Sequence, residues 1–507
     1  MRTPRCWRLC TFRRFQKLRE ILLLRLTRLA KAASVIVLLS ALGAGIYGMG
    51  RSLWLDEAWV ANSVQEPSLS AMFFHTDWLQ VNPPLFLLLV RNAVSLAGLS
   101  NASLRGVPLA LGMLGAISML LASRRVLSPA FAALACALLA LHPTAIEYSH
   151  TLKQYSGELA ASAVLLLATI LYLQQPGRGQ FAGLVAATVL TLPLAYPMVF
   201  LLPGVALAVY FISGRARFLL FSGAAGGMAL FLCVVFIRPN FSPALHEFFK
   251  TVADSGFSAG LAAAGLFCIF AAVRIGIALR RTNPGWREWT QIVCLLPCIL
   301  FAASAALGLY PSSHRTRLFL LPCFMLLLIM TAEELLGRLD VAVLCLTLAI
   351  PCWAIQKEVA EHRNLPEEDI AGSVRFLQRN LGPGDLVLVH PSVREGFLLY
   401  SRMYGWRTPP VIFTDTGWPC CQRGQDPKPG GSTEQAILED LHGRVPQGFS
   451  SRAWLYYTTR PTQWTYVGMK EQDTWKKYFW ERGCLAGPYF AFENQAISPM
   501  DCQRLRK

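Results

Sequence analysis

The sequence predicts an all-α polytopic membrane domain of about 11 spans, with juxtamembrane helices in the first outer loop, followed by a C-terminal extracytoplasmic α/β domain. Of the 507 residues, 54% are hydrophobic and only 15% are charged, which is typical of polytopic membrane proteins. Long apolar runs recur up to residue 355, and a balanced polar composition begins at residue 356. Most of the net charge of +17 lies in residues 1–355, where basic loops are expected. We therefore expect no nucleic-acid partner.

The N-terminal segment, residues 1–31, contains ten basic residues and one acidic residue, and the first apolar run follows it directly. Positive charge before a span favours a cytoplasmic N-terminus. The basic stretch is long, and no clear small-x-small cleavage pattern follows the apolar run. The segment is thus interpreted as part of a signal anchor rather than a cleaved signal peptide.

We divide the membrane domain, residues 32–355, into spans, because a helix that crosses a membrane needs about 20 apolar residues. The segment 82–100 is interrupted by Arg91 and is interpreted as a juxtamembrane hairpin. With that choice, 20 basic residues lie on the N-terminal side and eight on the opposite side, which supports a cytoplasmic N-terminus and an outer C-terminal tail. The predicted spans are 32–50, 106–122, 127–145, 159–175, 181–195, 197–213, 217–237, 258–278, 289–309, 317–334 and 339–355.

The C-terminal segment, residues 356–507, contains 19 basic and 17 acidic residues. Residues 371–391 predict an amphipathic helix, a Gly-Pro-Gly stop and a buried strand. Residues 409–417 and 451–461 predict further strands, with a helix at 432–445 between them. No nucleotide-binding glycine motif is present in this segment. We expect a small extracytoplasmic α/β domain.

The cysteines fall into two groups. Those in the apolar runs are expected to pack as small hydrophobic side chains. The four in the polar tail could form disulfides in an oxidising compartment, and four cysteines allow three connectivities. The sequence leaves this pairing open for Cys420, Cys421, Cys484 and Cys502.

Conspicuous polar residues share one predicted side of the membrane. Asp56 and Glu57 follow the first span, and the other clusters lie in loops far apart in sequence. Each has a simpler explanation, because acids at a span end are often merely solvated, and arginines and aromatics often anchor at interfaces. Placing so many ionisable side chains beside a bilayer interior nevertheless costs free energy, unless they pair with one another or serve a function. Their conjunction predicts a membrane-surface active site that includes Trp59, Asn82, Arg105, Glu147, Tyr148, Lys153, Tyr155, Arg315 and Arg317.

Over about the first 355 residues, these motifs resemble the polyprenol-phosphate-dependent GT-C type glycosyltransferases, the superfamily that contains protein O-mannosyltransferases and the lipid A aminoarabinose transferase. "LWLDEAWVANS" resembles the acidic signature of the first outer loop. "NPPLFLLLVRNAVSLAGLSNASLRG", "PTAIEYSHTLKQYSGELAA" and "YPSSHRTRLFLLP" resemble later motifs of the bacterial branch. Two positions depart from the pattern, since Asn82 stands where His or Lys is frequent and Lys153 stands where Arg is usual. Lysine keeps the charge but loses the bidentate fork of arginine.

The resemblance implies an inverting glycosyltransferase that moves a sugar from a polyprenyl-phosphate donor to a lipid, glycan or protein acceptor at the outer face of the cell (inner) membrane. Asp56 is the predicted base, because it matches the first acid of the family, and Glu57 is expected to tune it or to bind a sugar hydroxyl. Lys153, Arg315, Arg317 and Arg105 are the predicted donor-phosphate cations. No metal or other cofactor is expected. The predicted sugar or acceptor contacts are Glu147, Tyr148, Tyr155, Asn82 and Trp59.

Two other functions remain open. A transporter or flippase of lipid-linked intermediates would carry charges at mid-depth or paired broken helices, and the apolar runs are nearly free of acids. A non-catalytic scaffold with an outer binding domain is the second alternative. The sequence does not identify the sugar, the prenol length or the acceptor.

Overall fold

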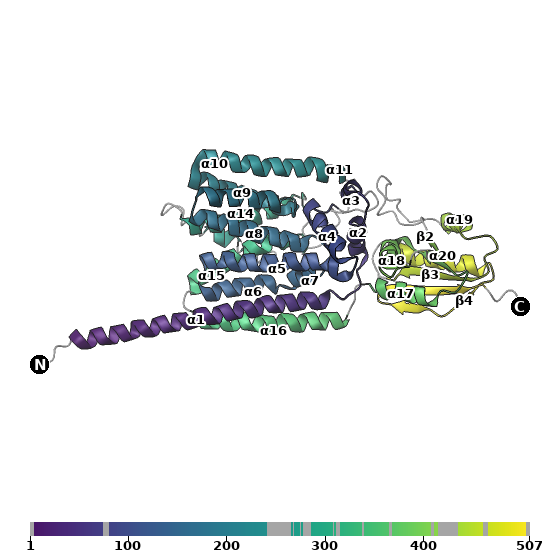
Figure 1. The fold of residues 1–507 in the computed structure, drawn as a ribbon, viewed down its shortest axis with the longest axis horizontal. Coiled ribbons are helices and arrows are strands. Elements are labelled where there is room, and N and C mark those ends of the chain that lie inside the picture. Colours follow the sequence, from purple (N-terminus) through teal and green to yellow (C-terminus); the bar gives the residue numbers. More distant parts are fainter. Residues whose placement is uncertain are drawn as a thin grey trace.

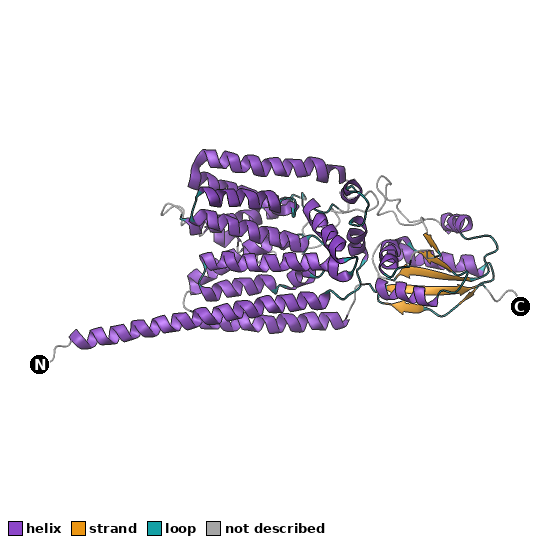
Figure 2. Ribbon diagram, in the orientation of Figure 1, coloured by secondary structure: helices purple, strands orange, loops and turns teal. Residues whose placement is uncertain are grey.

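The computed structural model describes residues 5–74, 81–240, 265–266, 268–273, 275–276, 285–307, 309–310, 315–336, 339–364, 368–406, 410–413, 434–459 and 465–502. Helices form a bundle, and a sheet-containing domain lies at one end of it, as Figures 1 and 2 show. We call this end of the bundle the domain-facing end. The N-terminal helix projects from the opposite end (Figure 1).

Seven helical segments are long and apolar enough to cross a membrane, or eight if one bent pair is a single span, among the described residues. The bent pair is α6 (Pro129–Ala140) and α7 (Pro143–Ser149), which meet at 58°. These segments confirm a polytopic helical domain, whereas the predicted count of 11 is not confirmed. The seven are Leu24–Gly48 in α1 (Arg5–Gly48), α5 (Asn101–Val126), α8 (Tyr155–Gln174), Leu202–Ile237, α14 (Trp286–Ala306), Leu318–Leu335 and Asp340–Lys357. The last two include most of α15 (Leu321–Leu336) and α16 (Asp340–Asn364).

The helix α10 (Leu202–Leu232) turns back on itself at Gly214, whose φ of 81° is readily adopted only by glycine. Just after the turn, Arg217 donates to the carbonyl of Pro176 at 2.7 Å, beyond the far end of α8. Past the other end of α10, Phe236 stacks on Phe74 with ring centroids 6.0 Å apart, near α3 (Leu69–Phe73) at the domain-facing end. The two halves are therefore antiparallel, which is why the sequence shows separate apolar runs at 197–213 and 217–237.

Short helices cover the domain-facing end of the bundle. They are α2 (Leu55–Ser63), α3 and α4 (Pro84–Ala97), with α2 beside the sheet domain in Figure 1. The helix α4 is apolar but only 14 residues long, so it is too short for a span, as the juxtamembrane prediction requires. Between α8 and α10 lie α9 (Arg178–Thr191) and η1 (Tyr196–Phe200). Most of the predicted span 258–278 lies outside the described residues.

The C-terminal domain is a mixed sheet with helices on it. Its strands β1 (Leu386–Val389), β2 (Val411–Phe413) and β3 (Arg452–Thr458) are parallel and alternate with α18 (Pro391–Met403) and α19 (Glu434–Arg444). The strands β4 (Leu485–Ala486) and β5 (Phe490–Phe492) pair antiparallel with β6 (Gln495–Asp501), which pairs with β3. The sheet order is β2-β1-β3-β6-β4. The helices α17 (Ile370–Asn380) and α20 (Thr465–Trp480) complete the domain.

A disulfide joins Cys484, just before β4, to Cys502, just after β6. It closes a loop with a sequence separation of 18 residues, and such closure restricts the unfolded chain. Cys420 and Cys421 lie outside the described residues.

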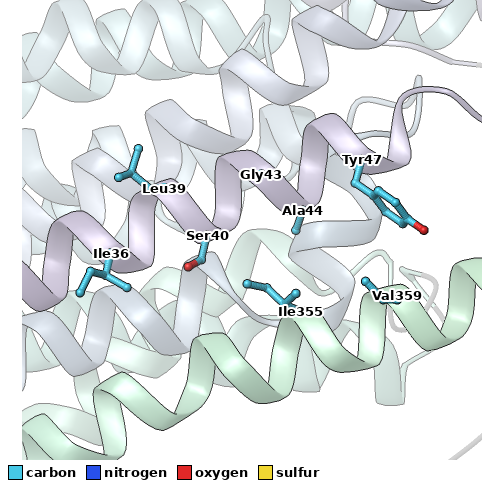
Figure 3. A pocket seen from close by; sticks show the side chains of 8 residues that line it. All are labelled: Ile36, Leu39, Ser40, Gly43, Ala44, Tyr47, Ile355 and Val359. Atoms are coloured by element: carbon cyan, nitrogen blue, oxygen red, sulfur yellow. The ribbon is translucent and has the colours of Figure 1, made fainter.

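A groove of about 520 Å³ runs between α1 and α16 on the side of the bundle (Figure 3). Its lining is almost entirely apolar and includes Ile36 and Leu39 of α1 and Ile355 and Val359 of α16. Several neighbouring apolar side chains are exposed, for example Leu39 at 62%. Exposed apolar helix faces of this kind suit contact with lipid chains.

Candidate functional site

The helix α2 carries Asp56 in its first turn, at the domain-facing end of the bundle. The Asp56 side chain is 24% exposed, and its Oδ2 lies 3.4 Å from Nζ of Lys153, which is only 9% exposed. Lys153 belongs to the loop between α7 and α8. The structure therefore brings the predicted base and one predicted phosphate cation into an ion pair, with the carboxylate still open to solvent.

Arg315 and two tyrosines lie near this pair. Arg315 lies just before the 3-10 helix η3 (Leu318–Leu320) and within electrostatic range of Asp56, Tyr148 and Tyr155. The rings of Tyr148 and Tyr155 pack edge to face, with centroids 4.7 Å apart. Both are amphipathic side chains that can contact a sugar ring. Segments far apart in the sequence thus supply one polar site.

The environment of Lys153 perturbs its titration. Burial lowers the pKa of the Lys153 ammonium, the Asp56 carboxylate partly offsets this shift, and Arg315 adds to it. A buried ammonium with a depressed pKa is held less firmly in its charged form than a surface lysine. Perturbed groups of this kind cluster at functional sites.

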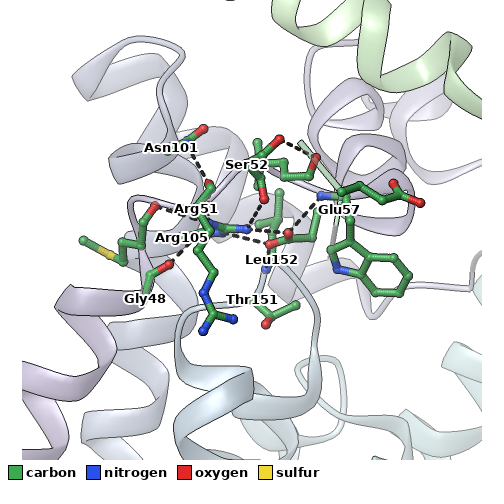
Figure 4. A network of polar contacts seen from close by, with 12 residues as sticks. Gly48, Arg51, Ser52, Glu57, Asn101, Arg105, Thr151 and Leu152 are labelled. Carbon is green, nitrogen blue, oxygen red and sulfur yellow. Dashed lines mark hydrogen bonds and ion pairs between the residues drawn. The ribbon is translucent and has the colours of Figure 1, made fainter. Parts of the chain in front are cut away.

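Glu57, the second predicted acid, is fully buried and bonded on both oxygens (Figure 4). Its Oε1 accepts from Nε of Arg105 at 2.9 Å and from the backbone N–H of Leu152 at 2.6 Å. Its Oε2 accepts from Nη2 of Arg105 at 2.5 Å and from the backbone N–H of Trp54 at 3.3 Å. This is a bidentate ion pair supported by two backbone donors.

The remaining donors of Arg105 face backbone carbonyls in the turn between α1 and α2. Nη1 donates to Gly48, Met49 and Arg51 at 3.5, 3.2 and 2.7 Å, and Nη2 donates to Ser52 at 3.1 Å. Every N–H of a guanidinium that is 3% exposed is therefore directed at a protein acceptor. The predicted roles of Arg105 in phosphate binding and of Glu57 in catalysis stay predictions. In this structure both side chains bond to the segment that carries Asp56.

The other predicted contacts lie around the same end of the bundle. Glu147 is on α7, within electrostatic range of Arg315. The carbonyl of Asn82 accepts from the hydroxyl of Tyr196 at 3.2 Å. Trp59 is partly buried on α2. Arg317 occupies the N-cap position of η3, and partial burial lowers the pKa of its guanidinium. Their contact with sugar, acceptor or phosphate stays a prediction.

A further buried acid, Glu158, lies near the predicted site residues. It lies in the first turn of α8, is 4% exposed, and its Oε2 has no hydrogen-bond partner among the described residues. Tyr155 interacts electrostatically with Glu158, and also with Asp56 and Arg315. A buried carboxylate oxygen without a partner is costly, so Glu158 is a further candidate at this site.

Residues of the C-terminal domain also reach the site, and the sequence analysis missed them. Tyr400, Glu368 and Glu395 contact the segment around Asp56. These contacts join positions more than 300 residues apart, and no local pattern in a single sequence signals such a pairing.

No family model and no curated protein sequence matches the chain. Among solved structures, the chain is similar to ArnT from Cupriavidus metallidurans bound to undecaprenyl phosphate, with a TM-score of 0.50 and 14% identity over 93% of this chain and 97% of that chain. The apo state of the same ArnT gives 0.46 and 15% over 94% and 99%. The oligosaccharyltransferase AglB from Archaeoglobus fulgidus, in complex with an inhibitory peptide and a dolichol-phosphate, gives 0.47 and 12% over 84% and 69%.

At this level of identity the similarity to ArnT concerns the fold. It extends over nearly the whole of both chains, and it agrees with the GT-C type architecture that the sequence predicts. The chain accordingly has the fold of ArnT, in its helical bundle and in its C-terminal domain.

Proposed function

We propose that this protein is an inverting glycosyltransferase that transfers a sugar from a polyprenyl phosphate to an acceptor. The observation that carries the proposal is the partly exposed Asp56 carboxylate paired with Lys153, with Arg315 beside it. Support comes from the shared fold with ArnT, whose structure holds undecaprenyl phosphate. A carboxylate beside two fixed cations suits a reaction that needs a base and produces an anionic phosphate.

In the proposed reaction, an acceptor hydroxyl attacks the anomeric carbon and its proton passes to Asp56. The bond between that carbon and the phosphate oxygen breaks, and its electron pair stays on the oxygen. The lipid phosphate thereby gains one negative charge. Cations placed before the reaction stabilise such charge well at a partly dry site, and Lys153 and Arg315 occupy that position.

The surrounding side chains are assigned to the sugar and the acceptor. Tyr148 and Tyr155 offer apolar ring faces and hydroxyls. Glu147 and Glu158 offer carboxyl oxygens that can accept hydrogen bonds from sugar hydroxyls. Glu57 and Arg105 are not included, because their polar atoms are already engaged with each other and with backbone groups.

We infer that the site and the C-terminal domain face the extracytoplasmic side of the cell membrane, with a cytoplasmic N-terminus. The excess of basic residues in the loops on the N-terminal side supports this orientation. The disulfide in the C-terminal domain also supports it, since structural disulfides persist in oxidising compartments.

The proposed function is tested by comparing envelope glycans and lipids from cells with and without the protein by mass spectrometry. We expect one sugar substituent to disappear, and undecaprenyl phosphate to bind the purified protein in phospholipid nanodiscs. An unchanged envelope would contradict transfer. If the protein instead moves a lipid-linked sugar across the membrane of proteoliposomes without transferring it, the protein is a flippase. If it shows neither transfer nor movement, the scaffold alternative is favoured.

The proposal includes no metal requirement. We expect transfer to persist in a chelator such as EDTA. Loss of transfer in chelator, with recovery on adding Mg²⁺ or Mn²⁺, would overturn this expectation.

The depressed pKa of Lys153 predicts the alkaline limit of phosphate binding. Affinity for undecaprenyl phosphate should be greatest where Lys153 is protonated, and it should fall as pH rises through a pKa below the ordinary value of 10.5. A Lys153→Arg variant should retain affinity over this range, because guanidinium stays charged. Lys153→Met should bind weakly and show no fall there. The measurement is a nanodisc titration with undecaprenyl phosphate at several pH values, and a wild-type affinity that is independent of pH would refute the role of Lys153.

A further inference from the structure

The segment of residues 52–62, which carries Asp56, lies between the helical bundle and the C-terminal domain. On the bundle side, the pair Glu57 and Arg105 fixes it. On the other side, it receives a second set of hydrogen bonds from the C-terminal domain. We call this second set the clasp, and its C-terminal members are Glu368, Ala371, Tyr400, Glu395 and Arg402.

The clasp first holds the chain just before α2. The backbone N–H of Leu53 donates to the Tyr400 hydroxyl at 2.6 Å, and the hydroxyl of Ser52 accepts from the backbone N–H of Ala371 at 3.0 Å. Leu53 is fully buried and Tyr400 is 1% exposed. Burial raises the pKa of Tyr400, so the phenol stays neutral and can accept this bond. Shielded bonds of this kind are costly to leave unmade.

The clasp also caps the N-terminus of α2 from the other domain. The N-cap position of α2 is Trp54, whose indole has no oxygen to accept from the first turn. Glu368 takes that role, since its Oε2 accepts from the backbone N–H of Leu55 at 3.1 Å. A carboxylate at a helix N-terminus is further stabilised by the helix dipole. Asp56 is the next residue after the one that Glu368 caps.

The far end of α2 is held as well. Nδ2 of Asn62 donates to the Glu395 carboxylate at 2.8 Å and to the Glu395 carbonyl at 3.0 Å. Arg402 donates to the Asn62 side-chain oxygen at 3.5 Å, and Asn62 is 4% exposed. The clasp thus bonds to the chain on both sides of Asp56.

We propose that the C-terminal domain is part of the transferase site, with Tyr400, Glu368 and Glu395 as positioning residues that orient the Asp56 carboxylate. This inference rests on the proposed function. None of the three needs to touch substrate, because each acts through the backbone or side chains of α2. Misplacement of a catalytic group by about 1 Å can reduce turnover by about 100-fold, so a domain that fixes α2 has a direct effect on rate.

Two conservative variants test the clasp in the full-length protein in phosphatidylglycerol and phosphatidylethanolamine nanodiscs. Tyr400→Phe removes the acceptor for Leu53, and Glu368→Gln weakens the acceptor for Leu55. Hydrogen exchange of residues 52–62 should accelerate on the order of tenfold in each, with α5 unchanged. The matched control is Tyr457→Phe, which loses a buried phenol that contacts Ser498 within the domain. If residues 52–62 exchange no faster in Tyr400→Phe and Glu368→Gln than in Tyr457→Phe, the clasp does not hold this segment.

A second measurement separates positioning from general stability. Affinity for undecaprenyl phosphate should remain within twofold of wild type, while the sugar content of the envelope in complemented cells should fall on the order of tenfold. Glu368→Gln should retain more activity than Glu368→Ala, because the amide oxygen still accepts a hydrogen bond. Faster exchange with full sugar transfer would overturn positioning while leaving the proposed function intact. If wild-type protein transfers no sugar, the proposed function and the positioning role that rests on it both fail, although the exchange measurement still decides whether the clasp holds α2.

Discussion

Asp56→Asn is expected to reduce sugar transfer by about 100-fold to 10,000-fold, the usual contribution of a positioned base. The amide has nearly the shape of the carboxylate but cannot take the acceptor proton. Affinity for undecaprenyl phosphate should be retained or should increase, because Lys153 loses the carboxylate that now lies 3.4 Å away. The checks are the envelope sugar content in complemented cells and a nanodisc titration with undecaprenyl phosphate.

The matched control is Glu66→Gln, which neutralises another carboxylate in the loop after α2 and should leave transfer unchanged. Full transfer by a folded Asp56→Asn variant would exclude Asp56 as the base. Loss of both transfer and lipid-phosphate binding would show that Asp56 shapes the site rather than taking a proton.

Arg105→Met is expected to destabilise the protein by about 3–5 kcal/mol, since breaking a buried ion pair leaves an uncompensated charge. Here the charge left behind is that of Glu57, which is fully buried. Four backbone carbonyls at the end of α1 and in the turn before α2 also lose one donor each. The midpoint of thermal unfolding in detergent micelles should fall markedly, and Arg105→Lys should be intermediate, because lysine lacks the planar fork.

Arg91→Met is the control, since its guanidinium binds the carbonyls of Glu66 and Pro67 at a more exposed position. It should cost no more than about 1 kcal/mol, as exposed interactions usually do. If the two methionine variants unfold at the same temperature, Arg105 does not hold the turn. Wild-type stability of Arg105→Met combined with weakened binding of undecaprenyl phosphate would restore the original phosphate assignment.

Much of the fold was predictable because its signals are local. Twenty-residue apolar runs predict helices that cross a bilayer, and 82–100 was recognised as different by Arg91, which interrupts it. The strands at 386–389 and 452–458 and the helix at 370–380 follow from periodicity and turn residues. The strand β6 and its partners β4 and β5 were not anticipated, because short strands gain stability mainly from their pairing.

The number of spans was harder to predict for a physical reason. Hydropathy identifies apolar segments, but it does not show that the predicted span 181–195 contains a helix, α9, of only 14 residues, or that α6 and α7 are bent by 58° where they meet. By contrast, the predicted boundary between the spans 197–213 and 217–237 coincides with the turn at Gly214.

The sequence by itself determined a polytopic helical domain, a C-terminal α/β domain and the nomination of Asp56 and Lys153, because hydropathy, periodicity and motif spacing are properties of the chain. Only the tertiary structure decided how the adjacent acids differ. Successive residues of a helix point about 100° apart, so Glu57 faces inward to Arg105 while Asp56 remains partly exposed beside Lys153. Only the tertiary structure, too, brought Tyr400 and Glu368 to α2, because a partner more than 300 residues away is selected by packing and leaves no local pattern in the sequence.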